Sequence, residues 1–448
     1  MTYPHLKITQ VLILVAITFF SFYWFPHPIL FIALGLIPFA VWGVINFSFY
    51  VVLGFVIFSF FRIHEVFPFL EPFKLPLLLA LASLFVISLR AFISQNLEPY
   101  WCPQFSLLIA FFILITLTIP FATNTPVAIK QWTSIFSKIV LMTFVIAWMM
   151  RKENHFIIVS RTFIFSGALV GLVTINNKIN AIGLVEGTRV TIGRAFGSVL
   201  GDPNDLALVL LYPTAFTIAT FLEKSISTLE RLCSLVTFSI LLYAIIATQS
   251  RGGLLGLVAV ASVFAYSRIR SKVILVFSGI VCLTILFIFA EINDRASGGA
   301  AEQGIDASAM GRLYAWEAAW KMALDNPISG VGISNFYYNY YFYSPHWDGS
   351  NHAVHSTWFG VLAETGFIGL ALFTTLIVST YMLSLKMLKM TDQICLNPGI
   401  KISLNALPAG IVGFIISGTF LTQGFTWPIY LQVALVIALN QYLVTLKK

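Results

Sequence analysis

The chain has 448 residues, of which 58% are hydrophobic and only 10% charged, and its formal net charge is +8. Soluble domains carry about 25% charged residues, so this deficit excludes a soluble protein and also a soluble core with a single anchor. It predicts an all-α polytopic membrane protein. The Lys and Arg residues lie mostly in short loops between apolar runs, which membrane orientation explains, so no nucleic acid partner is expected.

Apolar runs follow one another along the chain, and a spanning helix needs about 20 such residues. The candidate spans are 8–25, 28–45, 47–61, 75–93, 105–121, 138–150, 157–176, 205–222, 232–248, 253–268, 273–290, 367–388, 403–421 and 428–446. Residues 47–61 and 138–150 are short, and we interpret them as half-helices or extensions of their neighbours. The sequence therefore predicts a bundle of about 12, and up to 14, transmembrane helices.

Short basic loops indicate the orientation, because Lys and Arg favour the cytoplasmic side. The basic segments are 151–154, 268–272, the region of Lys386, Lys389 and Lys401, and the final Lys447-Lys448. We therefore expect both termini in the cytoplasm, and segments 177–204, 249–252 and 291–354 together on the outer face.

The long outer segment divides the chain into three parts. Residues 1–290 form the N-terminal transmembrane bundle, 291–354 a large outer loop, and 355–448 the C-terminal transmembrane helices. Loops longer than about 12–15 residues are usually functional or disordered. In this loop, residues 308–324 have a helical apolar rhythm, which predicts an amphipathic helix on the membrane surface. Membrane lipids are therefore among the expected partners.

Four charged residues far apart in the sequence are expected on this outer side: Arg194, Arg251, Arg312 and His355. Arg251 lies between two apolar runs, where an ionisable residue is costly and is usually functional or snorkels to lipid phosphate. Guanidinium groups hold phosphates bidentately and keep their charge. The arginines therefore favour a phosphate-bearing substrate, such as a lipid-linked diphosphate.

His355 has a side chain that can act as a base near neutral pH, although a helix cap is also a common role for such a residue. His352 stands three residues earlier and could share a metal with it, but the sequence offers no matching third ligand. No Walker A motif, GxGxxG, zinc signature or nucleophile elbow occurs in a suitable context. We expect neither a metal nor another cofactor.

Two further segments offer candidate substrate-binding residues. The "GDPND" motif predicts a turn followed by a helix cap at Asn204 or Asp205, and a binding role for Asp202 or Asn204 would be additional. The aromatic run at 336–347 includes Tyr338 and Tyr341. It fits a platform for sugar rings and an interfacial belt equally well.

The motif "HSTWFGVLAETGFIG" at 355–369 resembles the signature of bacterial O-antigen ligases, and related patterns occur in O-antigen polymerases of the same superfamily. "GRAFGSVLGDPNDLAL", "QSRGGLLGL" and "GRLYAWEAAWKMALDNPISGVG" are similar to its other recurrent blocks, in the same order, over roughly 190–370. The resemblance implies a GT-C-like bundle with a large periplasmic loop. It assigns catalytic roles to His355, Arg251 and Arg312, and makes Arg194 a substrate-binding candidate.

The resemblance also implies an activity. Such ligases move a glycan from undecaprenyl diphosphate to a lipid A–core sugar, with inversion and without a metal, at the periplasmic face of the bacterial inner membrane. Three alternatives stay open: a polymerase joining two carrier-linked glycans, a ligase acting on protein, and a transporter of the lipid-linked glycan. Gly366 and Gly369 are expected to let the following helix pack closely.

Overall fold

The computed structural model describes residues 42–92, 98–290, 307–391 and 396–446, with a few isolated residues before position 42. These residues form helices and connecting segments, and one isolated β-bridge joins Val185 to Arg189. The all-α membrane architecture predicted from composition is confirmed.

The helices follow the predicted apolar runs closely. Their bounds are α3 (Ser48–Phe60), α4 (Ile63–Val66), η1 (Pro68–Phe73), α5 (Leu75–Phe92), α6 (Pro103–Thr118), η2 (Ile119–Phe121), α7 (Thr125–Gln131), η3 (Trp132–Phe136), α8 (Ser137–Met149), α9 (Glu153–Ile179), η4 (Arg194–Phe196), η5 (Val199–Gly201), α10 (Pro203–Leu222), α11 (Thr228–Ala247), α12 (Arg251–Tyr266), α13 (Lys272–Phe289), α14 (Ala307–Asp325), α15 (Phe336–Tyr343), α16 (Thr357–Thr391), α17 (Pro398–Gly418) and α18 (Trp427–Leu446).

Nine helices in the described ranges are long and apolar enough to cross a membrane, and three shorter apolar helices accompany them. The shorter ones are Ser48–Phe60, Leu75–Arg90 and Arg251–Tyr266. The predicted spans 8–25 and 28–45 fall almost entirely outside the described residues. The total of 12 to 14 spans therefore stays a prediction.

One span differs from its prediction. The run 138–150 is not a half-helix, because α7, η3 and α8 continue as one helix over Thr125–Met149. Polar residues early in this helix lower its hydropathy and hide its first half from a sequence scan. Thr133 shows how the helix accommodates them, since its hydroxyl donates to the Ile129 carbonyl at 2.8 Å.

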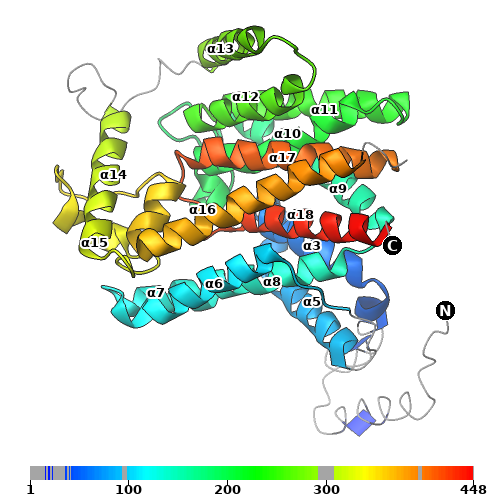
Figure 1. The fold of residues 1–448 in the computed structure, drawn as a ribbon, viewed down its shortest axis with the longest axis horizontal. Coiled ribbons are helices and arrows are strands. Elements are labelled where there is room, and N and C mark those ends of the chain that lie inside the picture. The colour runs from blue at the N-terminus through cyan, green and yellow to red at the C-terminus, as the bar shows by residue number, and fades with distance from the viewer. Residues whose placement is uncertain are drawn as a thin grey trace.

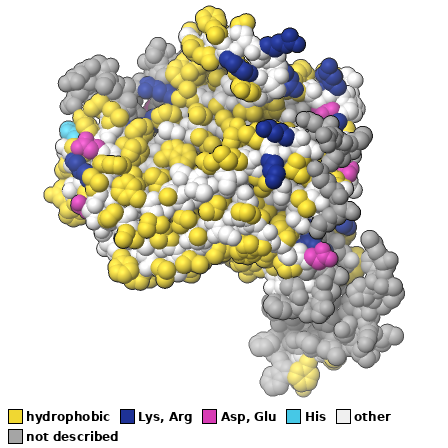
Figure 2. All heavy atoms as spheres, viewed as in Figure 1, with side chains coloured by type: hydrophobic (Ala, Val, Ile, Leu, Met, Phe, Trp, Pro, Cys, Tyr) yellow, Lys and Arg dark blue, Asp and Glu magenta, His cyan; other side chains and the backbone are white. Residues whose placement is uncertain are grey.

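The long helices run nearly parallel, and α14 stands across one end of the bundle (Figure 1). Hydrophobic side chains cover most of the face drawn in Figure 2, as expected for a surface in contact with lipid. Helices α10, α17 and α18 are largely buried in the centre, whereas α13 is exposed along nearly its whole length. The bundle thus has a packed centre and one peripheral helix.

The predicted surface helix exists as α14 and has two apolar faces. Its inward face buries Ala315, Ala319 and Met322 against α15 and α16. On its other face Leu313 and Trp320 are nearly half exposed. The inward face therefore holds α14 across the end of the bundle, and contact of the exposed face with the membrane surface stays a prediction.

Helix α16 begins ten residues before the predicted span 367–388 and has a kink at Gly366, whose φ is 69° and ψ is −172°. A Cβ at Gly366 would stand 2.5 Å from the Pro327 carbonyl oxygen. The expectation that Gly366 serves close helix packing is therefore wrong, because this glycine admits the backbone of the outer segment instead. Gly369 does face a helix, since its Cβ position lies 3.5 Å from the Leu114 side chain of α6.

Glu364 fixes the same outer segment from inside α16. Its carboxylate accepts hydrogen bonds from the backbone amides of Ser334, at 2.7 Å, and Phe336, at 3.3 Å. The Val331 amide donates to the Ala363 carbonyl at 2.8 Å. The charged residue within this apolar helix thus satisfies backbone donors just ahead of α15.

Candidate active site

The first residues of α10, α12 and α16 meet at one end of the bundle. The Ser250 hydroxyl, at the start of α12, donates to the Asn204 side-chain oxygen of α10 at 2.8 Å. A Cβ at Gly418, the last residue of α17, would stand 3.2 Å from the Thr357 hydroxyl of α16. Helix N-termini carry a partial positive charge and unsatisfied amides, so this arrangement favours an anion.

The start of α10 differs from the sequence interpretation. The cap is Asp202, which accepts from the amides of Asn204, at 2.7 Å, and Asp205, at 3.3 Å. The prediction of a cap at Asn204 or Asp205 is wrong, because Pro203 takes the first helical position and the residue before it becomes the cap. The Asn204 side chain is therefore available for other contacts.

Arg189 forms a hydrogen bond with the Asn204 side chain. The sequence analysis did not identify Arg189 as a site residue. Its guanidinium is buried and donates to the Asn204 side-chain oxygen at 2.9 Å and to the Thr248 carbonyl at 3.2 Å. The tight turn from Val185 to Arg189 aims it inward. The sequence feature that could have identified Arg189 is its position as a second arginine in the same outer segment, five residues before Arg194.

A carboxylate accompanies this buried charge. Glu186 lies 3.6 Å from the Arg189 guanidinium and is about one-third exposed. A buried cation needs such a partner or an anionic ligand to offset its desolvation. Arg189 is therefore held rigidly, with its charge beside the N-termini of α10 and α12.

Arg312 enters the same region from α14. One turn further along, the Trp316 indole donates to the Val354 carbonyl at 3.1 Å and stacks on Phe359 of α16 with centroids 5.3 Å apart. These contacts fix α14 against the start of α16. The Arg312 guanidinium carbon then lies 6.0 Å from the centre of the Phe420 ring.

The start of α12, which carries Arg251, also lies near Phe420. Arg251 is the first residue of the helix, and a Cβ at the following Gly252 would stand 3.2 Å from the Phe420 Cβ. The Ser250 hydroxyl caps the helix by accepting from the Gly253 amide at 3.1 Å. The backbone next to Arg251 and the guanidinium of Arg312 thus both lie near Phe420, although the two arginines are far apart in the sequence.

His355 stands directly before α16 in a strained conformation. Its φ is 46°, in the left-handed region that only a few per cent of non-glycine residues adopt. Val354 before it accepts the Trp316 hydrogen bond, and Ser356 after it caps the helix through the Phe359 amide at 3.4 Å. The backbone of His355 is therefore held in place from both sides, and strained backbone of this kind is common at functional sites.

The charges around His355 come from four segments of the chain. Burial lowers the pKa of His355 below its ordinary value of 6.5, and the nearby charge of Arg312 lowers this pKa further. Asp202 raises the pKa, whereas His352 and Arg189 lower it. The imidazole is consequently neutral at pH 7 and able to accept a proton.

His352 has a different environment. Its side chain is about 41% exposed, and its Nε2 lies 2.7 Å from a carboxylate oxygen of Asp348. Among the described residues, no three His, Cys, Asp or Glu side chains gather in a way that could hold a metal ion. The two histidines therefore have different surroundings.

Three predicted binding residues lie on exposed surfaces. Arg194 donates to the Gly201 carbonyl of its own turn at 3.2 Å. Tyr338 and Tyr341 are about half exposed on α15, and the Tyr341 ring stands edge-on to Trp347 with centroids 4.8 Å apart. The charges that influence His355 are those of Arg312, Asp202, His352 and Arg189 instead.

The segment after α17 ties the site together, and the sequence interpretation missed it as well. The Gln423 side chain donates to a carboxylate oxygen of Asp205 in α10 at 2.6 Å. Its backbone amide donates to the Thr357 hydroxyl at 3.2 Å, and that hydroxyl donates to the Leu421 carbonyl at 2.7 Å. This segment therefore fixes the spacing between the starts of α10 and α16.

A cavity of about 470 Å³ adjoins the site behind α10. Its walls are mostly apolar side chains of α3, α5 and α10, together with Trp427 and Pro428 at the start of α18. Lys138 and Arg62 add two cations, of which Arg62 is paired with Glu65, while the Asp205–Gln423 pair forms part of the wall. An apolar space with cations beside a polar site suits a lipid that carries an anionic group.

Comparison with known proteins agrees with this geometry. Residues 236–374 match a family model described as O-antigen ligase. This part of the chain is therefore similar to the O-antigen ligase family, in agreement with the motif resemblance. The range that matches this ligase family contains Arg251, Arg312 and His355, whereas Arg189 and Asn204 precede it. No curated protein matches the chain.

Proposed function

We propose that the protein is a glycosyltransferase that moves a glycan from undecaprenyl diphosphate to a periplasmic acceptor sugar such as lipid A–core. The observation that carries this proposal is the placement of His355, which has a lowered pKa and lies among charges of Arg312, Arg189 and Asp202. The family match supports the reaction class, and the three converging helix N-termini suit a diphosphate.

The reaction is a single displacement at the anomeric carbon. The acceptor oxygen forms a bond to this carbon, while the bond to the diphosphate oxygen breaks and its electron pair leaves with the diphosphate. His355 takes the acceptor hydroxyl proton. Arg251 and Arg312 stabilise the negative charge that develops on the leaving group. Attack opposite to the leaving group inverts the anomeric centre, and the scheme needs neither ATP nor a metal.

Arg189 and Asn204 act as positioning residues in this scheme. The Asn204 oxygen accepts from both Arg189 and Ser250, so it links the buried guanidinium to the cap of α12. Arg251 is the next residue after that cap. The pair thereby fixes the backbone from which Arg251 extends toward the diphosphate.

The carrier lipid occupies the cavity behind α10 in this proposal. Its isoprenoid chain lies along the apolar walls from α3 and α5, and Arg62 and Lys138 stand beside its path. The donor then reaches the site from within the membrane, whereas the acceptor arrives from the periplasm. This division explains why polar residues are concentrated at the mouth of an apolar bundle.

The orientation follows from charge. On the face shown in Figure 2, Lys and Arg side chains lie mostly on the right-hand half, away from the end crossed by α14. Basic residues favour the cytoplasmic side. We therefore propose a bacterial inner membrane protein with its active site on the periplasmic face and both termini in the cytoplasm.

The proposal is tested with the purified protein in lipid nanodiscs. Undecaprenyl-diphosphate glycan is supplied as donor, with either lipid A–core or a second carrier-linked glycan as acceptor. Transfer to lipid A–core identifies a ligase, and extension of the carrier-linked glycan identifies a polymerase. Unchanged donor with both acceptors, under conditions in which the protein stays folded, would refute the proposed activity.

A further inference from the structure

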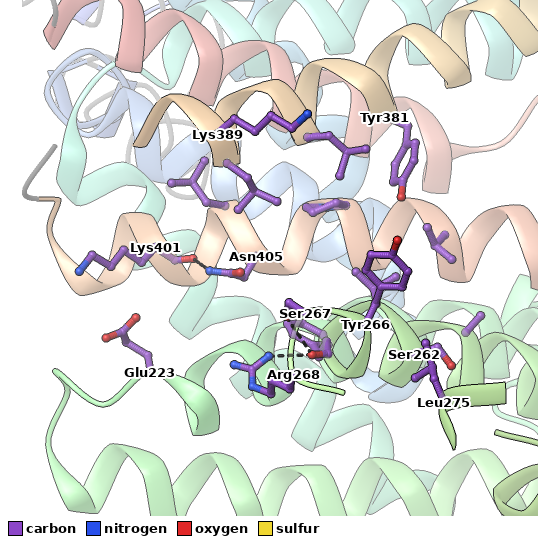
Figure 3. Close-up of a pocket in the computed structure, with 18 of the residues that line it drawn as sticks. Glu223, Ser262, Tyr266, Ser267, Arg268, Leu275, Tyr381, Lys389, Lys401 and Asn405 are labelled. Atoms are coloured by element: carbon purple, nitrogen blue, oxygen red, sulfur yellow. Dashed lines mark hydrogen bonds between the residues drawn. The ribbon is translucent and has the colours of Figure 1, made fainter. Parts of the chain in front are cut away.

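A second large hollow lies at the opposite end of α12 from Arg251. Its volume is about 1100 Å³, and it lies between α12 and α13 on one side and α16 and α17 on the other. Arg251 begins α12, whereas the hollow is lined by Tyr266 and Arg268 at the other end of this helix (Figure 3). The proposed transfer reaction does not use this groove.

The walls of the groove suit hydrocarbon chains. They include Val263 and Phe264 of α12, Leu385 of α16, and Leu404 and Val412 of α17. Helix α13 packs mainly on α12 and is exposed along nearly its whole length. The groove is thus an apolar space beside a peripheral helix, and the surrounding membrane lipid is its natural source of occupants.

One end of the groove is basic. Arg268, Lys389 and Lys401 come from three different segments and lie to the left of Tyr266 and Tyr381 in the view, and Glu223 is the one acid among the described residues that line the groove (Figure 3). Glu223 accepts from the amide of Ser225 at 3.1 Å. Across the described ranges, no carboxylate forms an ion pair with any of the three cations. The excess positive charge favours an anionic group.

A further cation lies beside Tyr266. The Lys272 ammonium lies 3.5 Å from the centre of the Tyr266 ring and donates to the Tyr266 carbonyl at 3.1 Å. Tyr266 and Tyr381 line the groove beyond the basic end (Figure 3). Tyrosines and basic residues at this depth mark the boundary between hydrocarbon and headgroups.

We propose that this groove binds an anionic glycerophospholipid of the cytoplasmic leaflet. The acyl chains lie between α12 and α17, and the headgroup phosphate lies among Arg268, Lys389 and Lys401. Basic pockets between transmembrane helices on the cytoplasmic side recognise such headgroups, and each cation near the surface adds to the attraction. Burial of the chains along the apolar walls supplies the rest of the affinity.

The experiment measures binding of phosphatidylglycerol and phosphatidylcholine to the full-length protein by native mass spectrometry. We expect phosphatidylglycerol to be retained and phosphatidylcholine to be lost. The double variant Arg268→Gln/Lys389→Gln should weaken phosphatidylglycerol binding about fivefold for each cation removed. The matched control Arg270→Gln/Lys386→Gln removes two exposed cations that do not line the groove, and should bind as the wild type does.

A second pair of variants tests the apolar part. Ala259 lines the groove, so Ala259→Trp should fill it and displace the lipid, whereas Ala261→Trp on the exposed side of the same helix should not. Thermal unfolding checks that each variant is folded. Equal retention of both lipids, equal losses in the two double variants, or displacement of phosphatidylglycerol by stoichiometric polyprenyl phosphate would each overturn the proposal.

Discussion

His355, the general base in the proposed function, is positioned by its neighbours in the chain. Its backbone is held in the left-handed region between the Trp316 contact at Val354 and the cap at Ser356. Its side chain is half-buried beside Arg312, so its proton affinity is reduced. Strain of this kind costs of order 1–3 kcal/mol and persists only where the surroundings enforce it.

The two histidines should differ sharply on substitution. His355→Ala should lower glycan transfer by about 10²–10⁴, because the general base is lost. His352→Ala should retain most of the activity, since this side chain pairs with Asp348 at the surface. Transfer is measured with a carrier-linked donor and purified enzyme, with and without EDTA. Equal losses in both variants together with EDTA sensitivity would indicate a metal site instead.

The lowered pKa of His355 predicts a pH profile. The neutral imidazole is the active form, so the acidic limb of kcat/KM should have its midpoint below the ordinary pKa of 6.5. Arg312→Gln removes a charge that lowers this pKa and should move the midpoint to higher pH. The profile of the residual Arg312→Gln activity is the decisive measurement, and an unchanged midpoint would show that Arg312 does not act on His355.

The arginines should be required for leaving-group stabilisation. Arg251→Ala and Arg312→Ala should each lower the transfer rate by about 10²–10³ while the protein stays folded. The corresponding lysine variants should recover only part of the loss, because lysine lacks the bidentate fork. Lys321→Ala is the control, since Lys321 lies on α14 in an exposed pair with Glu317. Full activity in Arg251→Ala would indicate that Arg251 only contacts lipid headgroups.

At the scale of the elements, the kink in α16 joins the outer segment to the membrane bundle. Gly366 leaves room for the Pro327 backbone, and Gly330 leaves room for the backbone at Glu364. The Glu364 carboxylate then holds the amides that precede α15. The position of α14, and with it that of Arg312, therefore depends on the contacts of Glu364 and Gly366, which lie more than forty residues further along the chain.

Two glycines with positive φ test this junction. Gly366 and Gly349 both have positive φ, but a Cβ would clash with Pro327 at Gly366 and would meet nothing within 4 Å at Gly349. Gly349→Ala should cost only about 1 kcal/mol of backbone strain. Gly366→Ala should destabilise the protein more and also lower transfer. Thermal unfolding in detergent and transfer assays measure the two effects, and equal behaviour of the variants would contradict the docking role.

At the scale of the whole molecule, the two ends of the bundle carry different chemistry. One end gathers helix N-termini, buried arginine and His355 beneath α14 (Figure 1). The other end carries the basic groove around Arg268 and Lys401. In the proposed orientation, the end with His355 faces the periplasm, where the acceptor lies. The basic groove then faces the cytoplasm, the side that Lys and Arg favour.

Sidedness is measured by cysteine labelling in a variant without the four native cysteines. A cysteine at Ser344, after α15, should react in intact cells with a thiol reagent that cannot cross the inner membrane. A cysteine at Ser271, between α12 and α13, should react only after the membrane is opened. The opposite pattern would reverse the proposed orientation and remove the periplasmic site.

The sequence by itself determined the all-α membrane architecture, since hydropathy reports burial in lipid over some twenty residues at a time. Motif similarity also singled out Arg251, Arg312 and His355. Only the tertiary structure decided that Arg189 is the buried arginine, that Asp202 is the cap, and that Gly366 admits the outer segment. These features depend on contacts between residues distant in the chain. Local composition and periodicity do not encode such contacts, because each depends on how whole helices pack.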